Sequence, residues 1–246
     1  MRDVSRLLSE NDDGWDFKVL VVGGEWVIRV PRGELGVEEL GKEIDLLPAL
    51  APALPVAVPR FEQVSRDPWF VVYRLIAGEP LRDEDPDGVR AFLDALHSFD
   101  ASALDVPRPE WRDIYRVHAE GWRRLVLPLL DADERVRGEA LLEEIETLTG
   151  YEPALVHCDL GPSHLIVREG QLAGVIDWAD AKIGDPAIDY AWLLNVPFPD
   201  WEVDDELRRR ALIYHRLGPW FEVDYGIRID ELRWVESGLA GVRSRL

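Results

Sequence analysis

The sequence predicts an α+β protein in which a small β-rich N-terminal lobe is followed by a larger, mainly helical C-terminal lobe. Strand and hairpin patterns dominate up to residue 76, and helical patterns dominate after a composition shift at 78–80. With 246 residues, 47% of them hydrophobic, the chain can bury the core of one large domain or of two modest lobes. We place the lobes at 1–77 and 78–246, with a hinge near 73–78.

A β-hairpin opens the N-terminal lobe. Residues 15–30 contain two β-rich runs divided by Gly23-Gly24, and a glycine pair between such runs is a strong hairpin signal. A second pair of strands is expected at 60–64 and 69–76. The N-terminal lobe should therefore be a small sheet.

One helix is expected between these strand pairs. Residues 37–47 place apolar side chains on one helical face. Because proline removes a backbone donor and clashes with the preceding turn, we expect this helix to end before Pro48.

Helical patterns dominate the C-terminal lobe. Its first helix should begin at Pro86 with Asp85 as the cap. Residues 153–178 interrupt the helices with a strand and then a hairpin that turns at Glu169-Gly170. The other helical stretches are expected at 111–130, 133–149, 187–195, 204–217 and 229–244.

Charge and composition narrow the possible partners. A net charge of −20 disfavours nucleic acid and anionic membranes and suits a cationic small molecule, unless it only keeps the protein soluble. A single cysteine allows no internal disulfide, and we find no signal peptide and no membrane-spanning run. We therefore expect a cytoplasmic protein that is a monomer or a weak dimer.

A polar segment lies between the strands of the C-terminal lobe. His157, Asp159 and His164 precede the hairpin, and Asp177 follows it. Because a hairpin returns its last residue near its first, Asp177 should lie close to His164 and Asp159. Two carboxylates and an imidazole can bind a divalent ion and orient a hydroxyl group, as phosphoryl transfer requires.

Each of these residues taken alone has a structural alternative. Asp159 could cap a turn, and His157 could be a hydrogen-bonded, half-buried histidine. The ordered set is harder to obtain by chance, and it matches the kinase catalytic loop H-x-D-x4-N followed by a metal-binding aspartate.

Residues 155–194 resemble the core of the aminoglycoside phosphotransferase family, whose members are antibiotic and small-metabolite kinases with a protein-kinase-like fold. The motifs LVHCDLGPSHLIV, VIDW and GDPAIDYA carry the resemblance, which extends upstream to GWDFKVLVVGGEWVIRVPR and GKEIDLLPAL. His164 stands where most members have asparagine. The macrolide 2'-phosphotransferase and aminoglycoside 2''-phosphotransferase branches resemble this chain in having histidine there.

The resemblance implies a role for each matched residue. Asp159 is expected to be the catalytic aspartate, which accepts or orients the proton of the substrate hydroxyl. His164 and Asp177 are expected to bind Mg²⁺. Contacts with the nucleotide, ATP or GTP, are expected from Arg29, Glu43, Arg74, Ile76 and Gly14.

Two matched positions depart from the family pattern. Arg29 stands where the family usually has lysine, and Glu43 matches the helix glutamate that pairs with this cation. Arg32 is the competing candidate if the strand register differs. Cys158 replaces a common glycine, and we interpret it as a packing substitution.

The sequence thus predicts a kinase that transfers the γ-phosphate of ATP or GTP to a hydroxyl of a cationic substrate such as an aminoglycoside or macrolide antibiotic. A kinase of a small metabolite, an amino alcohol or a sugar, is one alternative. A nucleotide-binding pseudokinase is the other, suggested by Arg29 and His164. Asp185 and Asp189 are expected to brace their loop instead of contacting a ligand.

Overall fold

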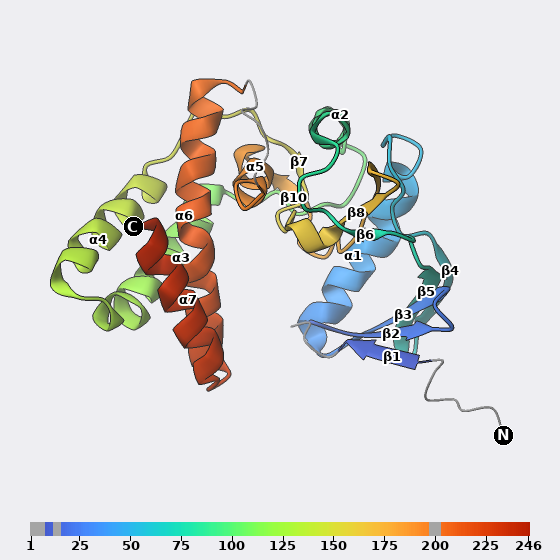
Figure 1. The fold of residues 1–246 in the computed structure, drawn as a ribbon, viewed down its shortest axis with the longest axis horizontal. Coiled ribbons are helices and arrows are strands. Elements are labelled where there is room, and N and C mark those ends of the chain that lie inside the picture. Colours follow the sequence, from blue (N-terminus) through green and yellow to red (C-terminus); the bar gives the residue numbers. More distant parts are fainter. Residues whose placement is uncertain (1–7, 12–15, 197–202) are drawn as a thin grey trace. The chain divides into compact units, whose positions relative to one another are not determined.

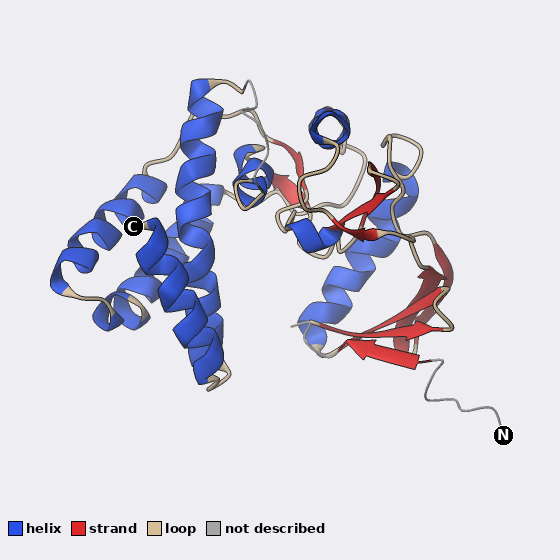
Figure 2. Cartoon of the chain, viewed as in Figure 1, coloured by secondary structure: helices blue, strands red, loops and turns tan. Residues whose placement is uncertain are grey.

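The computed structural model describes residues 8–11, 16–196 and 203–246, and the chain forms two compact units. Strands, two α-helices and the short 3-10 helix η3 (Pro162–His164) make up unit 1, and unit 2 is mainly helical (Figures 1 and 2). Unit 1 comprises Met1–Pro107, Ala154–Lys182 and Val196–Pro199, and unit 2 comprises Arg108–Pro153, Ile183–Asn195 and Asp200–Leu246.

A five-stranded antiparallel sheet with the order β1-β2-β3-β5-β4 forms the first part of unit 1. Gly23 and Gly24 connect β2 to β3 with φ angles of 63° and 69°, which glycine adopts readily, so the predicted hairpin is confirmed. The sequence did not predict β1. The strands are β1 (Leu8–Asn11), β2 (Phe17–Val22), β3 (Trp26–Pro31), β4 (Phe61–Arg66) and β5 (Trp69–Arg74).

Helix α1 (Glu34–Leu50) packs on this sheet through Leu40, which is buried in one cluster with residues of β2, β3 and β5. The predicted helix is correct in place but wrong at its end, because α1 continues through Pro48. Proline removes one N–H from the ladder, and the next turn still closes through the Ala51 N–H, which donates to the Leu47 carbonyl at 3.0 Å.

A second sheet in unit 1 has the strand order β6-β8-β9. The predicted hairpin is confirmed as β8 and β9, and it turns at Glu169 and Gly170 with φ angles of 55° and 77°. These strands are β6 (Glu79–Pro80), β8 (Leu165–Arg168) and β9 (Gln171–Val175), while β7 (Ala154–Val156) precedes the polar loop.

Helix α2 (Pro86–His97) begins at the predicted proline. The Asp85 carboxylate accepts the Gly88 N–H at 3.1 Å, as a helix cap does, and it also accepts the Leu172 N–H of β9 at 2.8 Å. One side chain therefore fixes both the start of α2 and the position of the hairpin.

The segment 75–78 lies tightly between the two sheets of unit 1. The Leu75 N–H donates to the Glu25 carbonyl at 2.8 Å, and Gly78 adopts a φ of 153°. A Cβ atom at Gly78 would lie 2.4 Å from the Val167 carbonyl oxygen, so a larger residue would not fit there.

The compact units differ from the predicted lobe boundary between residues 77 and 78. Hydrogen bonds join the hairpin to Ala57, before β4, and to Asp85, at the start of α2, so unit 1 extends beyond the hinge. We predicted that residues 1–77 bind the nucleotide and that residues 78–246 bind the substrate. Because this assignment concerns function, it stays a prediction.

Unit 2 is built on the long helix α6 (Asp205–Arg228), against which α5 and α7 pack. Helix α6 was predicted to end at residue 217 but continues through Pro219, with Trp220 buried beyond it. The other elements are α3 (Trp111–Leu125), η2 (Leu127–Leu129), α4 (Ala132–Glu146), α5 (Ala187–Leu193) and α7 (Leu232–Arg245), with β10 (Lys182–Gly184) at the boundary of the units in sequence. Among the described residues, no helix has the length and apolar character to span a membrane.

Candidate active site

The loop after β7 holds His157 in a fixed orientation. Its Nε2 atom lies 3.0 Å from the Ile176 carbonyl oxygen, which can only accept, so Nε2 carries a proton. Nδ1 accepts the Asp159 N–H at 3.3 Å, and the side chain is fully buried. His157 is therefore a structural histidine that connects the loop to the end of the hairpin.

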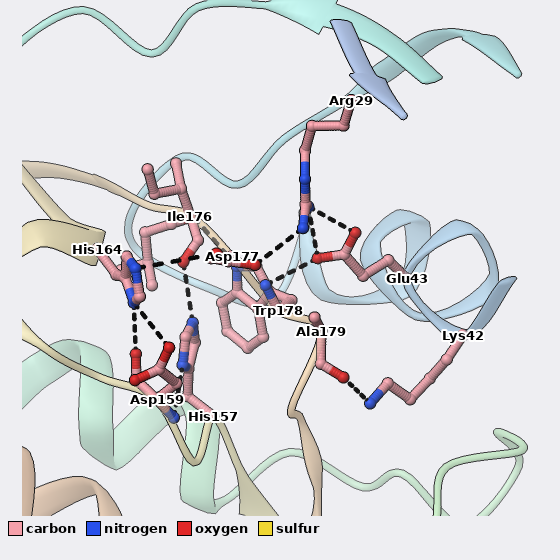
Figure 3. A network of polar contacts seen from close by, with 11 residues as sticks. Arg29, Lys42, Glu43, His157, Asp159, His164, Ile176, Asp177, Trp178 and Ala179 are labelled. Atoms are coloured by element: carbon pink, nitrogen blue, oxygen red, sulfur yellow. Dashed lines mark hydrogen bonds and ion pairs between the residues drawn. The ribbon is translucent and has the colours of Figure 1, made fainter. Parts of the chain in front are cut away.

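His164 lies between the two aspartates (Figure 3). Its Nδ1 atom donates to the Asp159 backbone carbonyl at 2.6 Å, which leaves the lone pair of a neutral ring on Nε2. That Nε2 atom is 3.9 Å from Asp177 Oδ2, and Nδ1 is 3.5 Å from Asp159 Oδ2. The hairpin thus brings all three side chains together, as its geometry predicted.

The two aspartates differ in proton affinity. Burial raises the pKa of Asp159 to about 6, with His164 opposing the change. Burial alone would also raise the pKa of Asp177, but Arg29 and His164 outweigh it and hold that pKa below its usual range. At neutral pH, Asp177 is therefore firmly ionised, whereas Asp159 is the more basic carboxylate.

Arg29 is the buried cation of β3, with only 3% of its surface exposed. Its Nη1 atom donates to both carboxylate oxygens of Glu43, at 2.9 and 2.7 Å, and Nη2 donates to Asp177 Oδ1 at 2.9 Å. Arg32 follows the end of β3 and is exposed. The structure therefore pairs Arg29 with Glu43, while its role toward a nucleotide stays a prediction.

Helix α1 also contacts the segment that follows Asp177. The Glu43 carboxylate accepts the Trp178 N–H at 2.8 Å, and the Lys42 ammonium donates to the Ala179 carbonyl (Figure 3). Burial lowers the pKa of Lys42. Sequence reasoning missed Lys42 because the helical pattern gives no sign that a lysine beside Glu43 points inward.

The donor atoms of Asp177 and His164 fit a divalent ion that is shared with a nucleotide. Among the described residues, no group of three or more His, Cys, Asp or Glu side chains is arranged to hold a metal. Mg²⁺, however, commonly takes one or two protein ligands together with substrate phosphates. Asp177 Oδ2 and His164 Nε2 can supply those ligands, although an imidazole is less suited to Mg²⁺ than an oxygen.

The remaining predicted nucleotide residues lie near the hinge, apart from Gly14, which is outside the described residues. Arg74 ends β5 with its guanidinium 3.9 Å from the centre of the Trp26 ring and 3.3 Å from the Glu25 carboxylate. Ile76 packs so closely on Gly174 that a Cβ there would lie 2.6 Å from its side chain. Arg74 is therefore engaged at the surface, and contact of residues 74–76 with a nucleotide stays a prediction.

Cys158 has a backbone conformation that favours glycine. Its φ is 69°, in the left-handed region that favours glycine, and Asp177 has a φ of 62°. The interpretation of Cys158 as a packing substitution is therefore incomplete, because a side chain is tolerated there at a conformational cost.

Asp185 braces its loop as expected. Its side chain is fully buried and accepts from Arg210 Nε at 2.8 Å, the Tyr214 hydroxyl at 3.2 Å and the Ala187 N–H at 3.0 Å. Asp189 is also fully buried, in the first turn of α5.

Kinase-like phosphotransferases pair a buried cation of a strand with a glutamate of a helix, and they carry one aspartate in the catalytic loop and another after a hairpin. The site described above has the same arrangement. The model of the Phosphotransferase enzyme family (APH) matches residues 8–224, and the chain belongs to this family. The predicted family and the predicted kinase-like α+β fold are both confirmed.

Two relatives show similar sequences over most of the chain. Viomycin phosphotransferase from Streptomyces vinaceus is 27% identical over 244 residues, covering 88% of this chain and 80% of the relative. The uncharacterized protein YcbJ from Bacillus subtilis (strain 168) is 27% identical over 217 residues, covering 73% and 67%.

Solved structures share the fold. The GDP and kanamycin complex of APH(2")-IIia superposes with a TM-score of 0.87 at 27% identity, covering 97% of this chain and 92% of that chain. The apoenzyme of a macrolide 2'-phosphotransferase from Brachybacterium faecium has a TM-score of 0.72 at 23% identity, covering 96% and 90%, and supports the fold alone.

Proposed function

We propose that the protein transfers the γ-phosphate of ATP or GTP to a hydroxyl of a cationic small molecule, such as an aminoglycoside or macrolide antibiotic. The observation that carries the proposal is the hairpin, which brings Asp159 and Asp177 together around His164. The buried pair of Arg29 and Glu43 lies next to Asp177 in the same unit. This combination suits charge neutralisation and positioning, which dominate phosphoryl transfer.

Asp159 is proposed to act on the acceptor. Its carboxylate orients the hydroxyl and takes its proton while the acceptor oxygen bonds to phosphorus and the bond to the leaving diphosphate breaks. The raised pKa of Asp159, about 6, still lies below neutral pH, so the carboxylate stays mostly ionised there while being a better base than an ordinary aspartate. Its side chain retains 34% exposure, enough to meet a substrate.

Asp177 and His164 are proposed to hold Mg²⁺, which when bound neutralises charge on the nucleotide phosphates. Arg29 holds the Asp177 carboxylate through one oxygen and leaves the other directed toward His164. The backbone of 74–76 is proposed to contact the purine. The GDP bound by APH(2")-IIia makes a guanine nucleotide the first donor to test.

The cationic acceptor is supported by charge and by relatives. The chain carries a net charge of −20, which raises the local concentration of cations. Relatives include a viomycin phosphotransferase and an enzyme solved with kanamycin. A cytoplasmic location and a monomeric or weakly dimeric state belong to the same proposal.

A nucleotide-binding pseudokinase is the alternative that a specific observation favours. Three hydrogen bonds of Arg29 go to Glu43 and Asp177, so the cation expected to grip phosphate is already engaged. This alternative predicts nucleotide binding without phosphorylation of any acceptor. A kinase of an amino alcohol or a sugar uses the same site and differs only in the acceptor.

The deciding experiment is nucleotide turnover by the purified protein with Mg²⁺, with ATP and GTP supplied separately. The acceptors are aminoglycosides, macrolides, viomycin and small amino alcohols, and the Asp159→Asn variant is measured beside the wild type. We expect one acceptor class to stimulate turnover, the variant to abolish it, and mass spectrometry to find a phosphorylated acceptor. Nucleotide binding with basal hydrolysis unchanged in the variant, and no phosphorylated acceptor, would favour the pseudokinase.

A further inference from the structure

The segment after β9 is held at consecutive residues by charged side chains of β3 and α1 (Figure 3). Arg29 donates to the carboxylate of Asp177, and Glu43 accepts the peptide N–H of the next residue. Lys42 then donates to the carbonyl oxygen of Ala179. The first two contacts follow from the pairing of a strand cation with a helix glutamate, but the third belongs to a residue with no assigned role.

The inward position of Lys42 is costly for a lysine. An ammonium group normally extends into water while its stem packs below it. Here burial lowers the pKa of Lys42, while Asp180 and Glu39 oppose that change. The contact with the Ala179 carbonyl compensates part of the lost hydration, so the lysine is committed to this backbone segment.

The held segment is a strained turn. Asp177 adopts a φ of 62°, which costs free energy in a residue with a side chain, and the Ala181 N–H donates to the Trp178 carbonyl at 3.1 Å. Such a conformation persists only where several contacts determine it. Without Lys42, the far end of the turn loses its charged contact, and the position of Asp177 depends on its ion pair with Arg29 and on the hydrogen bond that the Trp178 N–H donates to Glu43.

We infer that Lys42 is a positioning residue that fixes the turn 177–181 and thereby directs the Asp177 carboxylate toward a nucleotide-bound divalent cation. This inference rests on the proposed function. Lys42 acts through the backbone at Ala179 and is not placed in contact with a substrate. Its chemistry requires only a long cationic donor, so arginine should replace it and methionine should not.

The test compares Lys42→Met and Lys42→Arg with wild type and with Asp45→Asn, which changes an exposed charge on the same helix. Binding of a non-hydrolysable GTP analogue is titrated by calorimetry at increasing Mg²⁺ concentration. In Lys42→Met, the Mg²⁺ concentration for half-maximal binding should rise about tenfold, because loss of a residue that orients a ligand weakens metal affinity by about 10- to 100-fold. Lys42→Arg should restore most of this loss, and Asp45→Asn should behave as wild type.

A second readout separates positioning from simple stability. The acceptor KM should be unchanged in Lys42→Met, and amide exchange of the peptide covering 176–182 should be faster than in wild type. Unchanged Mg²⁺ dependence in Lys42→Met overturns the inference, as does a defect that arginine fails to restore. If the methionine variant does not fold, Lys42→Gln is compared with Lys42→Arg by the same titration.

The outcomes for the two proposals differ. A wild-type protein that binds the analogue with Mg²⁺ but phosphorylates no acceptor contradicts the proposed kinase activity, while the titration still decides the role of Lys42. A wild-type protein in which Mg²⁺ leaves binding of the analogue unchanged contradicts both.

Discussion

Two aspartates of this protein, Asp177 and Asp185, are both paired with a buried arginine but are built differently. Asp185 in unit 2 has no exposed surface, and arginine, tyrosine and a backbone N–H donate to it. Asp177 in unit 1 pairs with Arg29 through one oxygen, and its side chain keeps 40% exposure. A carboxylate with all its partners inside the protein stabilises the fold, whereas one with an open oxygen is available to a ligand.

The largest expected effect is the loss of turnover in a variant of Asp159, near the open carboxylate of Asp177. Asp159→Asn keeps the shape of the side chain but removes its ability to take a proton, so turnover should fall about 10²- to 10⁴-fold. The melting temperature should change little, because Asp159 is partly exposed. Steady-state kinetics and thermal unfolding of the same preparation check both parts, and retained turnover would remove Asp159 from the chemistry.

The closed carboxylate should show the opposite profile. Asp185→Ala leaves Arg210 buried without its partner and should cost about 3–5 kcal/mol of unfolding free energy. Asp204→Ala, which removes the exposed cap of α6, is the control and should cost only about 1 kcal/mol. Urea unfolding measures both variants, and equal losses would show that Asp185 is not the structural carboxylate described.

A third carboxylate should make stability depend on pH. Burial, together with Asp16 and Asp180, raises the pKa of Glu39 to about 8 from an ordinary 4.5, and its buried Oε2 has no hydrogen-bond partner. Between these two values the folded state binds more protons than the unfolded state, so Glu39 makes stability fall as pH rises. Glu39→Gln stays neutral and should therefore gain stability over wild type.

The stability that Glu39→Gln gains over wild type should grow from pH 5 to pH 8.5, as measured by thermal unfolding at fixed ionic strength. Glu38→Gln, an exposed change on the same helix, should show no such trend. A constant difference between Glu39→Gln and wild type across this range would mean that Glu39 ionises normally.

The smallest effect is expected at Cys158. Glycine removes the cost of the left-handed backbone, so Cys158→Gly should leave stability unchanged or raise it by about 1 kcal/mol. Cys158→Ala keeps the strain but loses the buried sulfur, and should be less stable than both. Chemical unfolding ranks the wild type and the two variants by stability. A glycine variant less stable than the alanine variant would show that packing outweighs the backbone strain.

Local sequence signals predicted one hairpin and the start of one helix correctly. The glycine pair at Gly23-Gly24 and the cap at Asp85 placed a hairpin and a helix correctly, because backbone conformation and capping are local properties. Pro48 misled, since packing of the flanking residues keeps α1 intact beyond this proline, and α6 likewise continues through Pro219.

The candidate site could be predicted only in part. Motif spacing and hairpin geometry brought Asp159, His164 and Asp177 together, and the resemblance named Glu43 as the partner of Arg29. The contact of Lys42 could not be predicted, because it joins residues 137 positions apart and depends on a side chain that turns inward against its usual preference.

The central claim, that Asp177 is open to a nucleotide-bound cation while Asp185 serves the fold, is tested most directly by one titration. Binding of a GTP analogue is measured against Mg²⁺ concentration for Asp177→Asn and for wild type, with thermal unfolding as the control for folding. The structure predicts that the variant stays folded and loses the Mg²⁺ dependence of binding. A folded variant that keeps the Mg²⁺ dependence of the wild type would contradict the claim.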